Sequence, residues 1–172
     1  TCGFIESAKT EAIENILEAC SYKQANPNLK VVVTGCLAER YRSQIEEEIP
    51  EVDAVVGCAS NKAIDSIVAR LAGGEEHLES YGLKKDFPLG GKRVIGTPAH
   101  YAYLKIAEGC NNRCHYCAIP AIRGPLRSRD MADCVAEARW LAGEGVKELI
   151  IVAQDPTAYG EDWGKPGSIC EL

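Results

Sequence analysis

The sequence predicts an α/β protein made of two successive units, each built around a parallel sheet. Short apolar runs alternate with segments of helical period over 1–72 and again over 101–172. This alternation is typical of parallel strands joined by helices. The chain has 172 residues, 46% of them hydrophobic, which is enough for two small domains with a core in each.

The first unit, 1–72, begins with a predicted helix. Its apolar positions recur at helical spacing: Ile13, Ile16, Leu17 and Cys20. Ser7 is the expected N-cap of this helix. A buried strand over "KVVVTG" then leads into a charged helix that runs to about Ile49, and "DAVVG" is the next strand. A last helix places Ile64, Ile67, Val68 and Leu71 on one face, which completes a domain of flavodoxin-like type.

Residues 73–100 contain many glycines, two prolines and no sustained period, so we expect a linker with at most local strand pairing. In 101–172, "YAYLKIA" predicts a strand, and either Ser128 or Asp130 caps a helix that ends at about Leu141. "ELIIVAQD" predicts a second, parallel strand. Two such repeats match the start of a (β/α) barrel, but an open doubly wound sheet has the same pattern at this point.

Composition limits the classes of function. The nine cysteines are accompanied by no leader and no apolar run of membrane-spanning length, so we expect a cytoplasmic protein whose thiols serve metal or redox chemistry. The net charge of −6 argues against a broad electrostatic contact with nucleic acid. The chain opens on "TCGF" and stops at "SICEL", and we expect a fragment that is inactive by itself.

Three cysteines, Cys110, Cys114 and Cys117, follow the strand of the second unit in "EGCNNRCHYC". A structural zinc site needs a fourth ligand, and His115 lies too close in sequence to reach the same ion easily. An electron-transfer cluster normally takes four cysteines with other spacing. A cubane cluster held by three thiolates leaves one iron open, which suits the binding of a cofactor.

This spacing, with Tyr116 before the last cysteine, resembles the signature of the radical S-adenosylmethionine (SAM) enzymes. The resemblance implies a 4Fe-4S cluster whose open iron is chelated by the amino and carboxylate groups of SAM, with Tyr116 near the adenine. In that family the cluster's electron cleaves the sulfonium and yields a 5'-deoxyadenosyl radical.

Four segments resemble the methylthiotransferases within this superfamily, most closely the branch that modifies a ribosomal protein: "TCGFIESAK", "VVVTGCLAERY", "YAYLKIAEGCNNRCHYCAIPAIRGPLRSR" and "GVKELIIVAQDPTAYG". The resemblance implies a flavodoxin-like domain, truncated at its start, followed by the first part of a radical-SAM partial (β/α) barrel. It also implies that Cys2 and Cys36 are two of three ligands of a second 4Fe-4S cluster, the third ligand lying upstream of this chain.

Further cofactor contacts are expected on the same end of the second sheet. Residues 109–129 contain four arginines and no acidic residue, and of these we select Arg123 and Arg129 on resemblance. Gln154, Asp155 and Thr157 follow the second strand, where ligands gather in parallel α/β proteins. A solvated basic loop and a capped turn are the alternative interpretations of these two groups.

Cys58 remains an open question in the first unit. Cys36 and Cys58 each end an apolar strand, so Cys58 is a candidate spare ligand beside Cys2. The family pattern asks for no cysteine there, and a small buried residue in a turn is the simpler interpretation. Cys20 and Cys134 lie within helical patterns, where we expect core residues.

The resemblance implies that a methylthio group is added to the β-carbon of an aspartate in small-subunit ribosomal protein twelve. A second SAM supplies the methyl group, and an electron donor such as a flavodoxin or ferredoxin reduces the clusters. The nearest alternative is methylthiolation of a tRNA adenosine, the one case that needs a nucleic-acid partner. Alternatives from other classes are an iron-sulfur electron carrier and a zinc-stabilised module.

Overall fold

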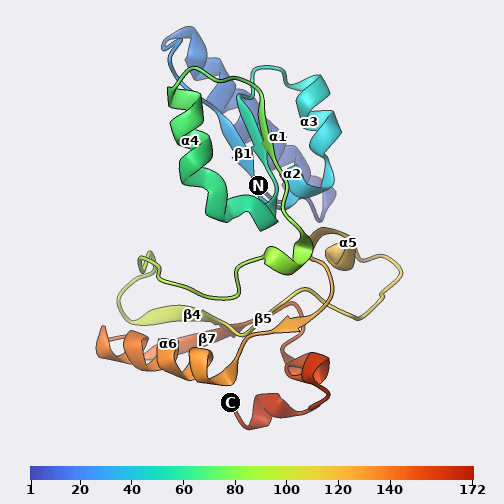
Figure 1. The fold of residues 1–172 in the computed structure, drawn as a ribbon, viewed down its shortest axis with the longest axis vertical. Coiled ribbons are helices and arrows are strands. Elements are labelled where there is room, and N and C mark those ends of the chain that lie inside the picture. Colours follow the sequence, from blue (N-terminus) through green and yellow to red (C-terminus); the bar gives the residue numbers. More distant parts are fainter. The chain divides into compact units, whose positions relative to one another are not determined.

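The computed structural model describes all residues, Thr1–Leu172, and divides into two compact units (Figure 1). Unit 1 comprises Thr1–Phe87 and unit 2 comprises Pro88–Leu172. Each unit combines helices with parallel strands, so the α/β class predicted from the sequence is confirmed.

The sheet of unit 1 has three parallel strands in the order β1-β2-β3. They are β1 (Val32–Thr34), β2 (Ala54–Val56) and β3 (Leu78–Ser80). In this register Thr34 lies opposite Val56, and Val56 lies opposite Ser80. All three strands therefore end at the same edge of the sheet, where the loops that follow them gather.

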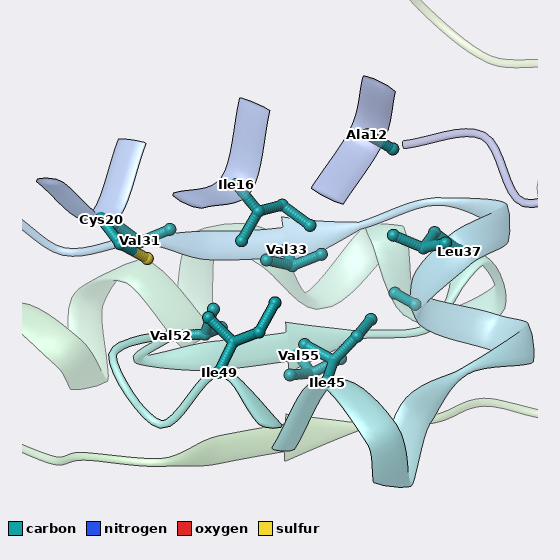
Figure 2. Close-up of a cluster of buried hydrophobic side chains, with 11 residues drawn as sticks. Ala12, Ile16, Cys20, Val31, Val33, Leu37, Ile45, Ile49, Val52 and Val55 are labelled. Carbon is teal, nitrogen blue, oxygen red and sulfur yellow. The ribbon is translucent and has the colours of Figure 1, made fainter. Parts of the chain in front are cut away.

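Helices cover both faces of this sheet. They are α1 (Glu6–Ser21), α2 (Cys36–Arg40), α3 (Arg42–Glu48) and α4 (Ile64–Ala72). Because side chains alternate along a strand, Val33 and Val55 enter a core with α1, α2 and α3 (Figure 2), whereas Val56 joins a second cluster with Ile67 and Leu71 of α4. This two-sided covering is why each strand is apolar along its length.

A buried carboxylate joins the chain before β1 to the chain before β2. Asp53 accepts hydrogen bonds from the Val31 N–H at 2.7 Å and from the Lys30 ammonium at 3.2 Å, and the Lys23 ammonium lies 2.5 Å from it. Burial acts to raise the pKa of Asp53, but the bonds from Lys23, Val31 and Lys30 outweigh it and hold the pKa below its ordinary value.

Two local expectations for unit 1 differ from the structure. Ser7 is not the N-cap, because α1 begins at Glu6 and the extended residue before it, Ile5, offers no side-chain cap. The helix expected to run to Ile49 is broken at Tyr41, whose φ of −120° and ψ of 33° are not helical, and this break separates α2 from α3.

The segment 73–100, expected as a linker, contributes a strand to unit 1. β3 pairs with β2 along its whole length, and Leu78 is buried in the cluster beneath α4. Three residues are too short to show a period in the sequence, which is why the strand was missed. The boundary between the compact units falls between Phe87, which is buried, and Pro88.

Unit 2 contains one strand-helix-strand repeat. β4 (Tyr101–Lys105) and β7 (Glu148–Val152) are parallel, with Tyr101 opposite Glu148, and α6 (Met131–Gly143) comes between them in sequence. Asp130, one of the two residues expected to cap this helix, accepts hydrogen bonds from the Ala132 and Asp133 N–H groups.

Shorter elements complete unit 2. They are β5 (Ala107–Glu108), α5 (Ile119–Arg123) and β6 (Arg127–Ser128), and β5 pairs with β6 in the antiparallel direction. The hydrophobic core of unit 2 is centred on Leu104, Ile106, Cys134 and Tyr159. The strands do not close into a barrel. None of the helices in the structure combines the length and the apolar character needed to cross a membrane.

Candidate functional site

The three cysteines of unit 2 lie in the loop Gly109–Ala118, which connects β5 to α5. Cys110 is buried, and its N–H donates to the Gly124 carbonyl at 3.2 Å, which fixes the start of the loop. Cys114 is exposed and Cys117 is half-buried. The loop thus has one anchored thiol and two thiols that are accessible from outside.

Gly109 sets the direction in which the chain leaves β5. Its φ is +76°, and a Cβ at this position would lie only 2.1 Å from the Pro125 carbonyl oxygen. A side chain is therefore excluded both by the backbone conformation and by the close approach of Pro125. The Gly109 N–H donates to Gln154 Oε1 at 2.9 Å, which ties the start of the cysteine loop to the segment after β7.

A second bond joins the same two segments. Asn112 Nδ2 donates to Asp155 Oδ2 at 2.5 Å, and the Thr157 hydroxyl donates to Asp155 Oδ1 at 2.6 Å. The bond from the Thr157 hydroxyl lowers the pKa of Asp155; burial opposes this effect, and the bond from Asn112 adds to it. The structure thus brings Gln154, Asp155 and Thr157 to the cysteine loop, and their contact with a cofactor stays a prediction.

The thiols themselves are not gathered into a metal site. No group of three or more Cys, His, Asp or Glu side chains in the structure lies close enough to hold a metal ion. Within the loop the Asn112 N–H donates to Cys110 Sγ at 3.4 Å, and the Cys114 N–H donates to the Asn112 carbonyl at 2.6 Å. Tyr116 is 91% exposed, so it covers nothing in this conformation.

The donor set nevertheless fits an iron-sulfur cluster. Three thiols and one aromatic residue stand on a ten-residue loop, and soft thiolates are the ligands that iron-sulfur clusters use. Cys110 Sγ already accepts a backbone N–H, the kind of contact that tunes such a cluster. Cys114 and Cys117 follow the two residues, Gly109 and Asn112, that bond to the segment after β7.

Arg123, predicted to contact the cofactor, is a partner of a buried carboxylate. Its Nη1 lies 3.1 Å from both carboxylate oxygens of Glu108, and the Lys105 ammonium contacts the same group. The Glu108 side chain is only 1% exposed. The positive charge expected over 109–129 is thus partly neutralised by the residue just before that range, a signal that was readable in the sequence.

Arg129, the other predicted arginine, is also engaged in unit 2. It forms an ion pair with Glu137 and donates to the Lys105 carbonyl at 3.3 Å and the Asp133 carbonyl at 3.2 Å. It lines a cavity of about 930 Å³ beside Trp140, and no residue of the cysteine loop lines that cavity. Contact of Arg123 or Arg129 with a cofactor stays a prediction, and their observed contacts are structural.

The predicted metal ligands of unit 1 lie at the end of β1. The Thr1 ammonium donates to the Thr34 carbonyl at 2.9 Å, and the Leu37 N–H is 3.4 Å from the Thr1 carbonyl. These bonds place Cys2, which is exposed, beside Cys36, which is buried. Their binding of a cluster stays a prediction.

Two other cysteines lie in the cores, as expected. Cys20 and Cys134 are buried, and burial raises the pKa of both thiols. A buried thiol of raised pKa is chemically inert, so these two residues belong to the packing rather than to a site.

Family comparisons agree with this arrangement. Residues 104–165 match the model of the Radical SAM superfamily, which covers the cysteine loop and the segment after β7. Residues 1–68 match a family described as uncharacterized protein family UPF0004. Unit 2 is thus of the radical SAM class.

Proteins similar to this chain along nearly its whole length identify the family within this class. The chain is 50% identical, over its full length, to a protein of Acetivibrio thermocellus named ribosomal protein uS12 methylthiotransferase RimO, and it spans 39% of that protein. A protein of Clostridium tetani with the same name is 51% identical over 94% of the chain, which spans 36% of that protein. A protein of Clostridioides difficile, again with the same name, is 48% identical over 96% of the chain, which spans 37% of it. The chain belongs to the radical SAM methylthiotransferase family.

Proposed function

We propose that the protein containing this chain adds a methylthio group to the β-carbon of an aspartate in small-subunit ribosomal protein uS12. The relatives mentioned above are named as methylthiotransferases of ribosomal protein uS12, and the chain spans about two fifths of their length. The observation in the structure that supports the proposal most directly is the pair of bonds from Gly109 to Gln154 and from Asn112 to Asp155. These bonds hold a three-cysteine loop against the ends of parallel strands.

The residues have distinct roles in this proposal. Cys110, Cys114 and Cys117 would hold a 4Fe-4S cluster, and Tyr116 would lie near the adenine of SAM. Cluster and SAM supply the one-electron chemistry that breaks a C–H bond too weakly acidic for a general base. Gln154 and Asp155 position the start of the loop, and the lowered pKa of Asp155 reflects the bonds that its carboxylate accepts from Thr157 and Asn112.

Unit 1 carries the cluster that supplies or relays the sulfur in this proposal. Cys2 and Cys36 provide two thiolates for a second 4Fe-4S cluster from one edge of the unit 1 sheet, where the bonds of Thr1 hold them. A second SAM provides the methyl group. A one-electron donor such as a flavodoxin or ferredoxin is required, and a cytoplasmic location follows from the ribosomal substrate. The tRNA alternative is not favoured, because the relatives are named for uS12.

Anaerobic reconstitution with iron and sulfide tests the cofactor part of the proposal. Electron paramagnetic resonance of the reduced protein should change when SAM is added, and Cys114→Ala should abolish the change. Cys170→Ala is the matched control, because Cys170 is exposed and lies outside the loop. Uptake of zinc, or a cluster whose spectrum ignores SAM, would contradict the assignment.

The substrate needs a separate measurement on the full-length protein. Incubation with uS12, SAM, sulfide and a reductant should increase the mass of uS12 by one methylthio group in place of one hydrogen, on an aspartate peptide. The matched substrate is uS12 with that aspartate changed to alanine, which should stay unmodified. Modification of a tRNA with no change in uS12 would favour the alternative.

A further inference from the structure

The segment 109–126, which contains the cysteine loop and α5, connects two strands that pair with each other. Because β5 and β6 are antiparallel neighbours, the segment leaves unit 2 and returns to it at the same place. The Cys110 N–H donates to the Gly124 carbonyl at 3.2 Å, which continues this pairing into the segment. The Leu126 N–H donates to Asn111 Oδ1 at 3.0 Å. The places of the thiols therefore depend on how the segment is closed at its base.

The buried carboxylate of Glu108 lies at this base. Arg123 Nη1 is 3.1 Å from both of its oxygens, and Arg123 is the last residue of α5. The N–H of Gly109, the first residue of the segment, lies 3.3 Å from Glu108 Oε1. The ammonium of Lys105, the last residue of β4, contacts the same carboxylate. Glu108 thus contacts the start of the segment, the end of α5 and the neighbouring strand.

The position of α5 depends on contacts from outside the helix. α5 has five residues, which are too few for a helix that is stable by itself in water. Two of its side chains attach it to the unit: Ile122 is buried, and Arg123 forms the ion pair with Glu108. Cys117 is followed directly by Ala118, the N-cap of α5, so a shift of α5 moves this thiol as well.

Packing alone does not account for a carboxylate at this place. Glu108 follows Ile106 and Ala107, which are both buried. Burial of two charges costs so much that an apolar pair of similar volume is often equally stable or more stable. An ion pair with hydrogen bonds differs from apolar contact because it also fixes the direction of approach. The pair is therefore suited to hold Arg123, and the residues that follow it, in one orientation.

We propose that Glu108 and Arg123 are positioning residues, whose ion pair closes the segment 109–126 and thereby sets the places of Cys110 and Cys117. The inference rests on the proposed function for what the thiols hold. It goes beyond that function because Glu108 has no part there. In this inference the pair affects the cluster through the thiols, without touching the cluster or SAM.

Thiol reactivity in the metal-free whole chain tests the positioning directly. The reduced chain is treated with iodoacetamide, and the alkylation rate of each cysteine is measured on its peptide by mass spectrometry. Arg123→Ala and Glu108→Gln should each raise the rate at Cys110, which is buried, at least about fivefold, because the open fraction of a segment rises when the contacts that close it are lost. The rate at Cys134, in the core of the same unit, should stay that of the parent.

Two controls separate positioning from a general loss of stability. Val146→Ala removes buried methyl groups before β7, at the opposite end of that strand from the cysteine loop, and should leave the Cys110 rate within about twofold of the parent. Arg123→Lys keeps a cation opposite Glu108 and should lie closer to the parent than Arg123→Ala. An unchanged Cys110 rate in both pair variants, or parallel increases at Cys110 and Cys134, overturns the inference.

Measurements on the reconstituted protein show whether the positioning affects the cluster. Titration of the SAM-dependent change in the electron paramagnetic resonance spectrum should give at least about tenfold weaker SAM binding for Arg123→Ala and Glu108→Gln, since loss of an outer contact of a metal site costs about 10–100-fold. Val146→Ala should match the parent. Pair variants that bind SAM as the parent does overturn the positioning role. A parent without any response to SAM, with a Cys110 rate that depends on the pair, contradicts the proposed function and supports the positioning of the thiols.

Discussion

The replacement of Arg123 by alanine separates its structural role from a cofactor role. The carboxylate of Glu108 is 1% exposed, whereas the side chains of Arg123 and Lys105 are 27% and 34% exposed. Removal of one partner from a buried ion pair costs about 3–5 kcal/mol, because an uncompensated charge is left inside. Lys105 remains in contact with Glu108, so we expect the lower end, about 3 kcal/mol, for Arg123→Ala.

Replacement of the partner carboxylate, Glu108, should lower the free energy of unfolding by less. Glu108→Gln keeps the shape of the side chain and leaves two cations that both reach solvent, so we expect about 1–2 kcal/mol. In the double variant no buried charge is left, and its loss should be smaller than the sum of the two single losses. The asymmetry between the single variants therefore identifies Glu108 as the group that needs compensation.

Urea unfolding followed by tryptophan fluorescence measures these losses. The two tryptophans, Trp140 and Trp163, both lie in unit 2, so the signal reports on that unit alone. The experiment omits iron and SAM, so a role of Arg123 in cofactor binding cannot contribute. Arg139→Ala on the exposed face of α6 is the control and should stay within about 0.5 kcal/mol of the parent. An equally small effect of Arg123→Ala, or additive losses in the double variant, would refute the reasoning.

Three further predictions concern stability. Asp53→Asn should lower the free energy of unfolding by about 2 kcal/mol at pH 7. The pKa of Asp53 in the folded state lies below its ordinary 3.8, so the difference from the parent should vanish as pH falls below the folded-state pKa. Urea unfolding followed by circular dichroism measures this difference. Gly109→Ala should lower the free energy of unfolding, measured by tryptophan fluorescence, by at least about 3 kcal/mol. Gly143 has an ordinary φ and open space around it, so Gly143→Ala should raise the free energy of unfolding by about 0.4–1 kcal/mol. Tyr159→Phe removes a buried bond to the Arg129 carbonyl at 2.7 Å and should cost about 1–2 kcal/mol in the same assay, and an unchanged midpoint would contradict the importance of that bond.

The parts predicted best from the sequence are those that depend on local pattern. β4 and β7 were predicted because both are five-residue strands in apolar runs. Asp130 was one of two predicted caps, because an N-cap residue directly precedes the first residue of its helix. β3 was missed because a three-residue strand is defined by its partner, β2, and not by its own composition.

The contacts of the candidate site depend on pairing between distant segments. The arginines of 109–129 were taken as a positive island because that range begins one residue after Glu108, and the ion pair between Arg123 and Glu108 joins the end of α5 to β5. The bond from Asn112 to Asp155 joins residues 43 apart, and no local pattern reports it. The end of the sheet on which Asp155 lies was predictable, because parallel strands share their direction.

The cysteines at the sheet edges share one local sequence feature, which occurs in both units. Glycine precedes the cysteine in Gly35–Cys36, Gly57–Cys58 and Gly109–Cys110. Gly35 has a φ of +113° and a Cβ there would lie 2.7 Å from Thr1, while at Gly109 the corresponding contact is with Pro125. At these two positions the glycine lets a neighbouring segment pass directly against the end of a strand, so the next residue is held against that segment. Thiols placed in this way are fixed by backbone geometry, and for this reason we expect Cys36 and Cys110 to tolerate movement least among the cysteines of the two predicted sites.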